Sequence, residues 1–547
     1  MMQRVFDGMA KQASVEFLCF KSFLPGKKTL GEFYRFIDLL ADFGYNALML
    51  EIGGAMEYEK HPEINTGWEE YSKICDEFNG KRILLQRSYI YPKDSIHTEN
   101  GEGSYLTKQE LKAIAAYCAD QGIEIIPEVP CFSHADYLLY PHPEFAECPD
   151  EPLPTNACPS NEGYYALLFD VLDEVIEVFA PKRINICHDE AYVYGQCPRC
   201  KEKSAAELFG GHIVRVHDYL EKQGVKTMIW GDGIIPTWHG GNAAMHRRYP
   251  WDGKRTVTVK DKVYEVHNFS CHSMEDWAKI KEKEPDATGW FVAEKSGAMD
   301  MMPSDLEVMN WSWGVDAKSD GYTTEKGLYQ VYGNFQAIQM KNLKQRLAAG
   351  VSGYSYSHWG RADLATMQYN GALFGMAYNS LACHDIAYDE SKREKNIQTA
   401  SDAVYHCLNK DVLSGKHLRV VHTTDAMMEH VGFYDGYQLE QEAFMIGSYE
   451  VVYADQSKES FPIYWGYNIG NAYVVWDASN EKNKRLMEDG SYHTKHIFEP
   501  IGASRPIISG AKTWYETVFP VRQDVTEVAL RSCDGVCIEL KEWSVEE

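Results

Sequence analysis

The sequence predicts an α/β protein whose main part is a (β/α)8 barrel, followed by a β-sandwich. Three observations lead to this prediction. Apolar runs typical of buried strands alternate with amphipathic helical segments, eight such runs occur before residue 400, and the helical periodicity ends after about residue 410. The chain has 547 residues, and a barrel with insertions can use roughly 200 to 400 of them. An open, doubly wound sheet is the alternative for the same alternation.

The first strand and helix show the pattern that then repeats. The run "SVEFLCF" (14–20) suits a strand, and "TLGEFYRFIDLLADFG" (29–44) suits a helix. Thr29 and Glu32 have the spacing of a capping box, and Gly44 suits the position after a helix end. One face of this helix is apolar through Phe33, Phe36, Ile37 and Leu40.

Later segments repeat the same alternation. Thr107 and Glu110 form a second capping box, and helical spacing of apolar residues continues to Gly122. Eight strand–helix units are the number in a (β/α)8 barrel, so we predict a barrel in preference to an open sheet. The predicted strands are 14–20, 45–54, 123–129, 184–190, 226–232, 306–314, 327–335 and 350–359.

The domain boundary is expected near residue 416. Residues 1–416 should form the barrel, with a long insertion at about 239–303 in which "TVTVKDKVYEV" suits a hairpin. Residues 417–547 alternate in hydrophobicity and contain turn signals, so they should form an accessory β-sandwich of the jelly-roll kind.

Charge and composition exclude several partners. With 54 Lys and Arg against 80 Asp and Glu, the net charge is −26, which disfavours nucleic acid and anionic membranes. The sequence has no apolar run of about 20 residues, and its first 20 residues lack a signal-peptide core. We therefore expect a cytoplasmic protein whose 14 cysteines are thiols or metal ligands. The sequence does not specify an oligomeric state.

Polar and aromatic side chains gather where the predicted strands end, which is where barrels carry their active sites. Carboxylates transfer protons and aromatic rings stack on sugars, so the set suggests carbohydrate chemistry. No glycine-rich phosphate loop is present, which disfavours phosphoryl transfer. The set comprises Lys21, Glu51, Glu128, His134, His188, Asp189, Glu190, Trp230, Asp232, Trp311, Trp313, Tyr332, Asn334, His358, Trp359, Arg361 and Asp363.

Asp189 and Glu190 are adjacent in "INICHDEAYVYG". Successive strand residues point to opposite faces, so one carboxylate can enter the site while the other supports it only where the strand ends. Their proximity disfavours joint ionisation and raises one pKa, as a general acid requires. The alternative is a solvated start of a loop.

Several stretches resemble glycoside hydrolase family 20, the β-N-acetylhexosaminidases. "INICHDEAYVYG" is similar to the family's Asp-Glu strand, and "LTKQELKAIAAYCADQGIEIIPEVPCFSH" to its third helix–strand unit. "YNALMLEIGGAMEYE", "TMIWGDG" and "GYSYSHWGRAD" resemble strands of the hexosaminidase D branch, which is intracellular and lacks the usual N-terminal α/β domain. The resemblance spans about residues 15–400. It implies an exo-acting hydrolase of small glycans or glycosides that needs no cofactor for catalysis.

The resemblance also implies roles for individual residues. Asp189 would orient the substrate acetamide, Glu190 would be the general acid/base, and His134 would be the loop histidine beside them. Tyr332 would touch the acetamide oxygen. The expected substrate-binding residues are Lys21, Glu51, His134, Trp230, Asp232, Trp311, Tyr332, Trp359 and Arg361.

Three departures from the family pattern concern the sugar rather than the activity class. Cys187 and His188 precede the acidic pair where glycines are usual, which crowds the strand. Lys21 replaces an arginine that holds sugar hydroxyls in many members. Arg361 and Asp363 stand where a glutamate is common.

The cysteines of two neighbouring loops suggest a structural zinc. "QCPRC" places Cys197 and Cys200 at knuckle spacing, and Cys148 and Cys158 lie in the preceding βα loop. The four could bind one zinc and pin both loops. Four surface thiols without metal are the alternative.

Two other functions stay open at this stage. A retaining glycosidase for a sugar without the acetamido group could use Glu128 or Glu51 as its nucleophile. A noncatalytic carbohydrate-binding barrel is the second, although the Asp189-Glu190 pair favours an enzyme.

Overall fold

The computed structural model describes most of the chain. The described residues are 15–78, 97–149, 154–191, 194–235, 244–247, 255–259, 262–266, 292–295, 297–314, 318–369, 371–385, 387–426, 445–473, 504–510, 512–522 and 524–547.

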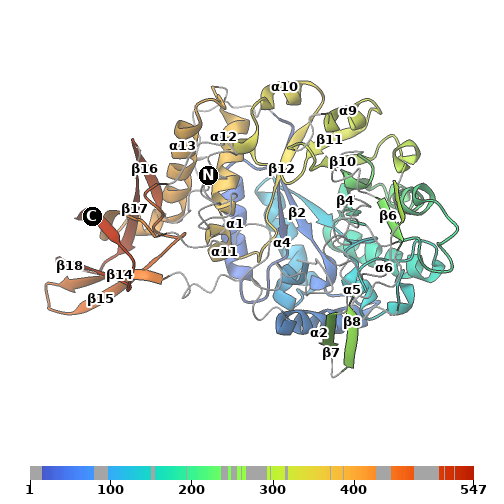
Figure 1. Cartoon of the computed structure of the whole chain (residues 1–547), viewed down its shortest axis with the longest axis horizontal. Helices are drawn as coiled ribbons and strands as arrows, with labels where there is room; N and C mark the ends of the chain where they lie inside the picture. Colours follow the sequence, from blue (N-terminus) through green and yellow to red (C-terminus); the bar gives the residue numbers. More distant parts are fainter. Residues whose placement is uncertain are drawn as a thin grey trace, which may run out of the picture.

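Eight parallel strands form a closed barrel at the centre of the molecule, in the order β1-β12-β11-β10-β5-β4-β3-β2 (Figure 1). This confirms the predicted barrel. Each observed strand falls within or overlaps a predicted one, and the longest predictions extend past the true strand ends. The strands are β1 (Phe17–Phe23), β2 (Ala47–Glu51), β3 (Glu124–Glu128), β4 (Arg183–Asn185), β5 (Lys226–Trp230), β10 (Glu307–Asn310), β11 (Tyr329–Tyr332) and β12 (Gly353–Ser357).

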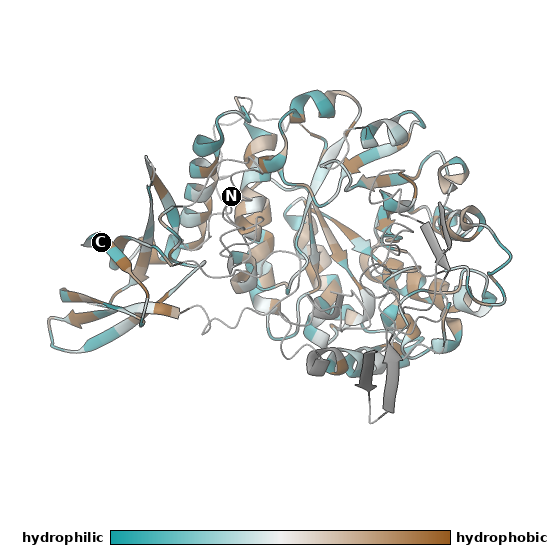
Figure 2. Cartoon of the chain, in the orientation of Figure 1, coloured by the Kyte–Doolittle hydropathy of each residue, from teal (hydrophilic) through white to brown (hydrophobic). Residues whose placement is uncertain are grey.

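Helices surround the barrel and turn their apolar faces toward it (Figures 1 and 2). In α1 the buried residues include the four predicted from spacing, Phe33, Phe36, Ile37 and Leu40. The helices are α1 (Leu30–Asp42), α2 (Pro62–Phe78), α4 (Lys108–Asp120), α5 (Asp136–Leu139), α6 (Glu162–Phe179), α7 (Gly211–Lys222), α9 (Ser319–Thr324), α10 (Leu343–Ala348), α11 (Leu364–Tyr369), α12 (Ala372–His384), α13 (Arg393–Leu408) and α14 (Lys410–Leu413).

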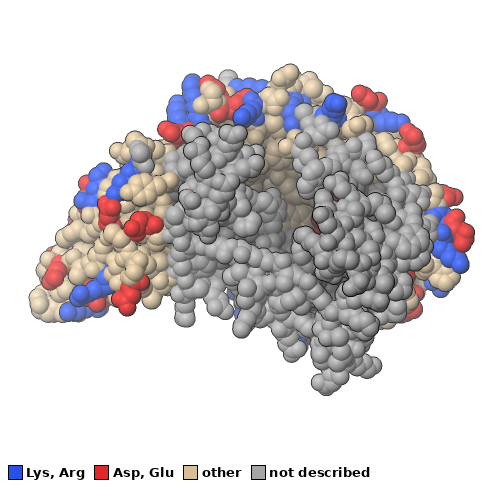
Figure 3. Space-filling model, in the orientation of Figure 1, with Lys and Arg blue, Asp and Glu red and all other residues tan. Residues whose placement is uncertain are grey.

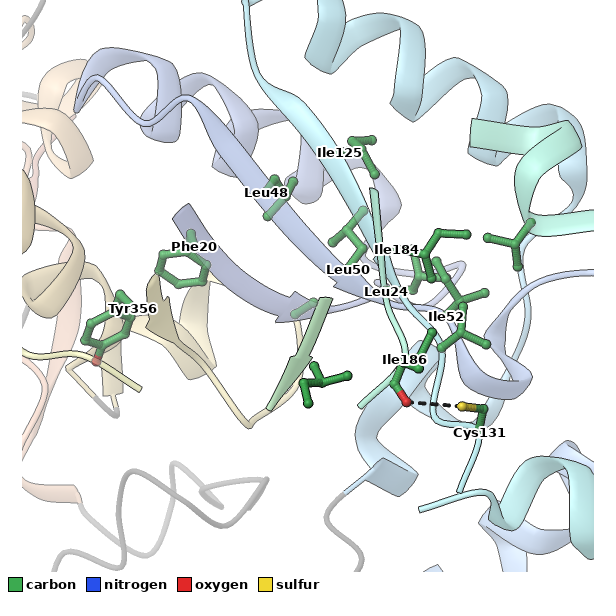
Figure 4. Packing of buried hydrophobic residues seen from close by; sticks show 14 of the residues in the cluster. Phe20, Leu24, Leu48, Leu50, Ile52, Ile125, Cys131, Ile184, Ile186 and Tyr356 are labelled. Atoms are coloured by element: carbon green, nitrogen blue, oxygen red, sulfur yellow. Dashed lines mark hydrogen bonds between the residues drawn. The ribbon is translucent and has the colours of Figure 1, made fainter. Parts of the chain in front are cut away.

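Alternation along each strand separates two layers of core. Leu48 and Leu50 of β2 pack outward in the helix-facing core, as Figure 4 shows, whereas Met49 belongs to the separate cluster inside the barrel. Phe20 of β1 lies beside Tyr356 of β12 in the outer layer, with ring centroids 5.5 Å apart. Strand alternation therefore determines which side chains face the barrel interior and can reach the site.

Only one of the two predicted capping boxes exists. At the start of α4, Thr107 accepts from the backbone of Glu110 and the Glu110 carboxylate reaches back to the Thr107 backbone, as predicted. At the start of α1, Thr29 makes no capping bond, and its hydroxyl instead donates to Glu102 over 2.9 Å. The expectation for Thr29 and Glu32 was wrong because a carboxylate distant in sequence competes for the hydroxyl.

The C-terminal part is a β-sandwich, as predicted, and lies beside α13 (Figure 1). Its core joins residues of both sheets, for example Val420 and Tyr449. Arg505 pairs with Asp402 of α13 over 3.4 Å. One sheet contains β13 (His417–Thr424), β16 (Arg505–Ser509), β17 (Lys512–Pro520) and β19 (Ile538–Glu546), and the other β14 (Met445–Tyr453), β15 (Lys458–Tyr464) and β18 (Val525–Ser532).

The insertion contains the expected hairpin. Strands β7 (Arg255–Val259) and β8 (Lys262–Val266) pair antiparallel, and β6 (Ala244–Arg247) pairs with β9 (Val292–Lys295). Most of the remainder of 239–303 lies outside the described residues.

The described surface carries both signs of charge. In Figure 3, Lys and Arg lie intermingled with Asp and Glu around the described rim of the visible face. Among the helices that the structure describes, none is long and apolar enough to cross a membrane.

Candidate active site

A buried ionic cluster closes the barrel interior at the carboxyl ends of the first three strands. Lys21 of β1 lies 3.2 Å from Glu51 of β2 and 3.4 Å from Glu128 of β3. All three side chains are at most 1% exposed. A buried cation is tolerated there because two carboxylates compensate its charge.

Two tryptophans complete this cluster. The Trp230 indole donates to Glu128 over 2.7 Å, and the Lys21 ammonium lies 3.4 Å from the Trp359 ring centroid. The two indole rings are 5.8 Å apart. Trp359 donates to Asn334 over 2.9 Å, which fixes its orientation. An ammonium over an indole face is a favourable electrostatic contact that a buried lysine can keep.

This cluster is poorly suited to supply a nucleophile. Burial raises the pKa of Glu51 to about 7, although Lys21 lowers it. Burial also raises the pKa of Glu128, although the charge of Lys21 lowers it. Both carboxylates are held by Lys21 and are almost fully buried. A nucleophile must reach an anomeric carbon, so this geometry weighs against the Glu51 and Glu128 alternatives.

The acidic pair lies on an unusual turn after β4. Cys187, His188 and Glu190 have φ values of 61°, 73° and 50°, which are left-handed conformations that favour glycine. The turn redirects the chain so that Asp189 and Glu190 do not follow strand alternation.

Side chains stabilise this strained turn. Asn185 accepts from the Cys187 backbone over 2.8 Å, and the Ser133 hydroxyl donates to the Asp189 carbonyl. His188 bonds through Nδ1 to the Ile186 carbonyl and through Nε2 to Nδ1 of His212, 3.0 Å away. Since a carbonyl only accepts, Nδ1 of His188 carries the proton and His212 is the donor to Nε2. Burial lowers the pKa of His188 to about 3, so the ring is neutral.

His134 connects both members of the acidic pair. Its Nε2 lies 3.5 Å from Asp189 Oδ2 and 3.5 Å from Glu190 Oε2. Burial by itself would lower the pKa of His134, but the two carboxylates raise it to about 10. His134 is therefore cationic at neutral pH. The side chain of Asp189 is 11% exposed and that of Glu190 is 40% exposed, so Glu190 is the more accessible acid.

Asp232 supports the pair from the short turn that follows β5. One of its oxygens accepts from the Glu190 backbone over 2.8 Å, and the other accepts from the Trp311 indole over 3.0 Å. Asp232 was expected to bind substrate, but both oxygens are engaged in positioning Glu190 and Trp311. Burial raises the pKa values of Asp189 and Asp232 to about 7, and repulsion between these carboxylates adds to the effect at Asp232.

The expected role of Tyr332 was wrong. Its side chain is fully buried on the outer face of the barrel, and its hydroxyl donates to Asp320 over 2.7 Å. Asp320 also accepts two 2.7 Å bonds from Arg346. Val331 belongs to the interior cluster, so strand alternation directs Tyr332 outward, away from the acidic pair.

We expect Tyr332→Phe to reduce stability without impairing substrate binding. It removes one hydrogen bond to a charged group, a loss of about 1.5–3 kcal/mol in the free energy of unfolding. Denaturant unfolding measures this loss, with Tyr322→Phe, an exposed tyrosine nearby, as the control. A several-fold rise in KM with unchanged stability would instead place Tyr332 at the substrate.

Within the described part of the chain, Arg361 pairs with two carboxylates outside the acidic pair. Its guanidinium lies 3.0 Å from Glu102 and 3.4 Å from Asp363. Its predicted role in binding sugar hydroxyls therefore stays a prediction, and two carboxylates already compensate its charge.

The predicted zinc ligands assemble with one change. Cys158, Cys197 and Cys200 form a group with Glu147 in which all ligand atoms lie within 4.8 Å of one another. Cys148 does not belong to this group. The expectation of four cysteines was wrong at that position because the chain turns the preceding residue, Glu147, toward the other three.

Sequence reasoning missed two supporting residues, Ser133 and Asn185, which brace the turn. Asn334 was in the predicted strand-end set, and the structure shows that it accepts a hydrogen bond from Trp359. Asn185 lies on β4 two residues before Cys187, so alternation could have placed it inside the barrel. Ser133 lies in a loop, where the sequence offers no comparable signal.

Comparisons with known proteins agree with this geometry. Residues 29–263 match the model of the "Glycosyl hydrolase family 20, catalytic domain", a stretch that includes His134, Asp189, Glu190, Trp230 and Asp232. Residues 29–263 are thus similar to the catalytic domain of glycosyl hydrolase family 20. The family 20 match covers β2 to β5 of the barrel and ends before β10.

Three of the curated proteins that this chain is similar to are β-hexosaminidases. One from Akkermansia muciniphila is 28% identical over 240 residues, which cover 40% of this chain and 43% of the relative. One from Porphyromonas gingivalis is 23% identical over 337 residues, which cover 54% of this chain and 42% of the relative. One from Vibrio furnissii is 27% identical over 246 residues, which cover 39% of this chain and 38% of the relative. The chain thus matches less than half the length of these relatives.

Proposed function

We propose that this protein is an exo-acting glycoside hydrolase that releases terminal β-linked N-acetylhexosamine with retention of configuration. The observation that carries the proposal is the placement of Asp189 and Glu190 on one turn, both 3.5 Å from His134. Neighbouring carboxylates cannot act from opposite faces of a glycosidic bond as an ordinary nucleophile and acid do. The nucleophile must therefore come from elsewhere, and the other candidates, Glu51 and Glu128, are held by Lys21.

The substrate's own acetamido group can supply this nucleophile. Its carbonyl oxygen attacks the anomeric carbon as Glu190 protonates the departing glycosidic oxygen, and an oxazolinium ion forms. Asp189 accepts the amide N–H and stabilises the positive charge. Glu190, now ionised, removes a proton from water, which attacks the same carbon and reopens the ring. Two displacements at one carbon give overall retention. No cofactor takes part in these steps.

A panel of nitrophenyl glycosides tests the proposed function. We expect turnover of the β-N-acetylglucosaminide, the β-N-acetylgalactosaminide, or both, and at least about 10³-fold lower kcat/KM for the β-glucoside and β-galactoside, since these lack the internal nucleophile. Equal turnover of plain and acetamido glycosides would favour a protein nucleophile. Binding without turnover of any substrate would favour a noncatalytic barrel.

The acid limb of the pH profile should depend on His134. The cationic ring favours ionised Asp189, so His134→Gln should raise the pKa of Asp189 above its value of about 7. Because ionised Asp189 is the active form, the acid limb of kcat/KM should move to higher pH by about 1–3 units, the usual effect of removing an adjacent opposite charge. His406→Gln, exposed on α13, is the control. An unmoved limb would mean that His134 does not set the ionisation of Asp189.

The cytoplasmic location, the small glycan substrate and the lack of nucleic-acid or membrane partners stay predictions from the sequence. Fractionation of the source cells, with activity followed on the preferred nitrophenyl substrate, tests the location.

A further inference from the structure

Two loops that carry the acidic pair and His134 are held together by a compact group of buried ligand atoms. The loop after β3 contributes Glu147 and Cys158, and the loop after β4 contributes Cys197 and Cys200. Cys158 and Cys200 are fully buried, and Glu147 is 1% exposed. All four ligand atoms lie within 4.8 Å of one another.

The sulfur separations suit a shared ion rather than a disulfide. Sγ of Cys158 lies 3.4 Å from Sγ of Cys197 and 3.5 Å from Sγ of Cys200. A disulfide bond is about 2.05 Å long. Two sulfurs bound at about 2.3 Å to one tetrahedral zinc ion are about 3.8 Å apart. Both observed distances are therefore much closer to those of two ligands on one metal.

Glu147 supplies an independent sign of a missing ligand. Its Oε1 accepts from the backbone N–H groups of Gln196 and Cys197. Its Oε2 is buried and has no hydrogen-bond partner among the described residues. A buried carboxylate oxygen without a partner is unfavourable, since burial removes its hydration. A cation held with the three sulfurs would compensate it.

The backbone prepares this geometry without the metal. Residues Ala146 and Ala157 form an antiparallel bridge that places Glu147 near Cys158. The N–H groups of Cys200 and Lys201 both donate to the Cys197 carbonyl over 3.0 Å, a tight turn that brings the two sulfurs of the Cys-x-x-Cys segment to one side. Both halves of the site are therefore formed by local structure.

We propose that Glu147, Cys158, Cys197 and Cys200 bind one structural zinc ion in a Cys3Glu site. Three thiolates and a carboxylate form a closed tetrahedral set with no open position, which fits a structural rather than a catalytic metal. The ion fastens the loop that begins near His134 to the segment that follows Glu190. Nearer the barrel, a hydrogen bond already joins the same two loops. The Cys131 thiol donates to the Ile186 carbonyl over 3.2 Å (Figure 4).

Metal analysis and X-ray absorption of the full-length wild-type protein test the site. Protein purified without chelators should contain about one zinc per chain, with three sulfurs at about 2.3 Å and one oxygen at about 2.0–2.2 Å. A spectrum that shows four sulfur ligands would mean that a fourth cysteine takes the place of Glu147, and it would contradict this ligand set. Well under one zinc per chain, or an intact mass showing a disulfide among these cysteines, would overturn the site.

Variants locate the metal independently of activity. Cys200→Ser and Glu147→Gln should each lower zinc content several-fold, whereas Cys407→Ser, which alters a half-buried cysteine on α13, should retain one zinc. Retention of one zinc by Cys200→Ser would contradict the assignment. If a variant fails to fold, the absorption spectrum of the wild-type protein still decides. Neither result depends on glycosidase activity, so this proposal and the proposed function can fail separately.

Discussion

Replacing Glu190 by Gln should lower kcat/KM by about 10²–10⁴ for N-acetylhexosaminides with poor leaving groups, the usual contribution of a general acid. The loss should be much smaller for nitrophenyl leaving groups in the first step, because they depart without a proton. Glu190 is the more exposed member of the pair and keeps its backbone fixed by Asp232, so Gln fits the same position. Steady-state kinetics on a leaving-group series measures the effect.

The control for this variant is Glu202→Gln, which changes an exposed carboxylate in the same loop. It should leave kcat/KM unchanged. An equal loss for good and poor leaving groups would contradict the role of Glu190 as the acid, since the dependence on the leaving group defines that role.

Replacing Asp189 by Asn should lower kcat/KM by about 10²–10³ for good and poor leaving groups alike. The expected size is that of removing one group that stabilises developing charge. Asn keeps the shape but not the negative charge, and Glu190 is then the member of the pair that still has a carboxyl group near His134. Pre-steady-state and steady-state rates with nitrophenyl N-acetylglucosaminide measure the loss.

Asp120→Asn, at the exposed end of α4, is the matched control and should be silent. A loss at Asp189 that vanishes with activated leaving groups would mean that Asp189, and not Glu190, donates the proton. The two carboxylates would then exchange roles.

Much of the barrel could be predicted because burial leaves a clear periodic signal. The β2 run is continuous in sequence, the apolar face of α1 recurs at helical spacing, and each packs as expected. The facing of Tyr332 required the structure. Val331 lies in the interior cluster, and strand alternation then directs Tyr332 outward.

Other features depend on contacts that sequence spacing does not contain. The Thr29 hydroxyl donates to Glu102, 73 residues away in sequence, and does not cap the helix. Glu147 replaces Cys148 as a candidate ligand because loop geometry, and not residue type, decides which side chain turns inward. The acidic pair does not follow strand alternation because Cys187 and His188 adopt left-handed conformations. Residues other than glycine seldom adopt these conformations.

The most direct test of the mechanism changes the nucleophile itself. In a series of nitrophenyl glycosides whose N-acetyl group is replaced by N-fluoroacetyl, N-difluoroacetyl and N-trifluoroacetyl, each fluorine makes the amide oxygen less nucleophilic. If the acetamido oxygen attacks the anomeric carbon, kcat/KM should fall steeply along the series, at constant pH and with the same leaving group. A flat response would contradict substrate assistance and would require a nucleophile from the protein.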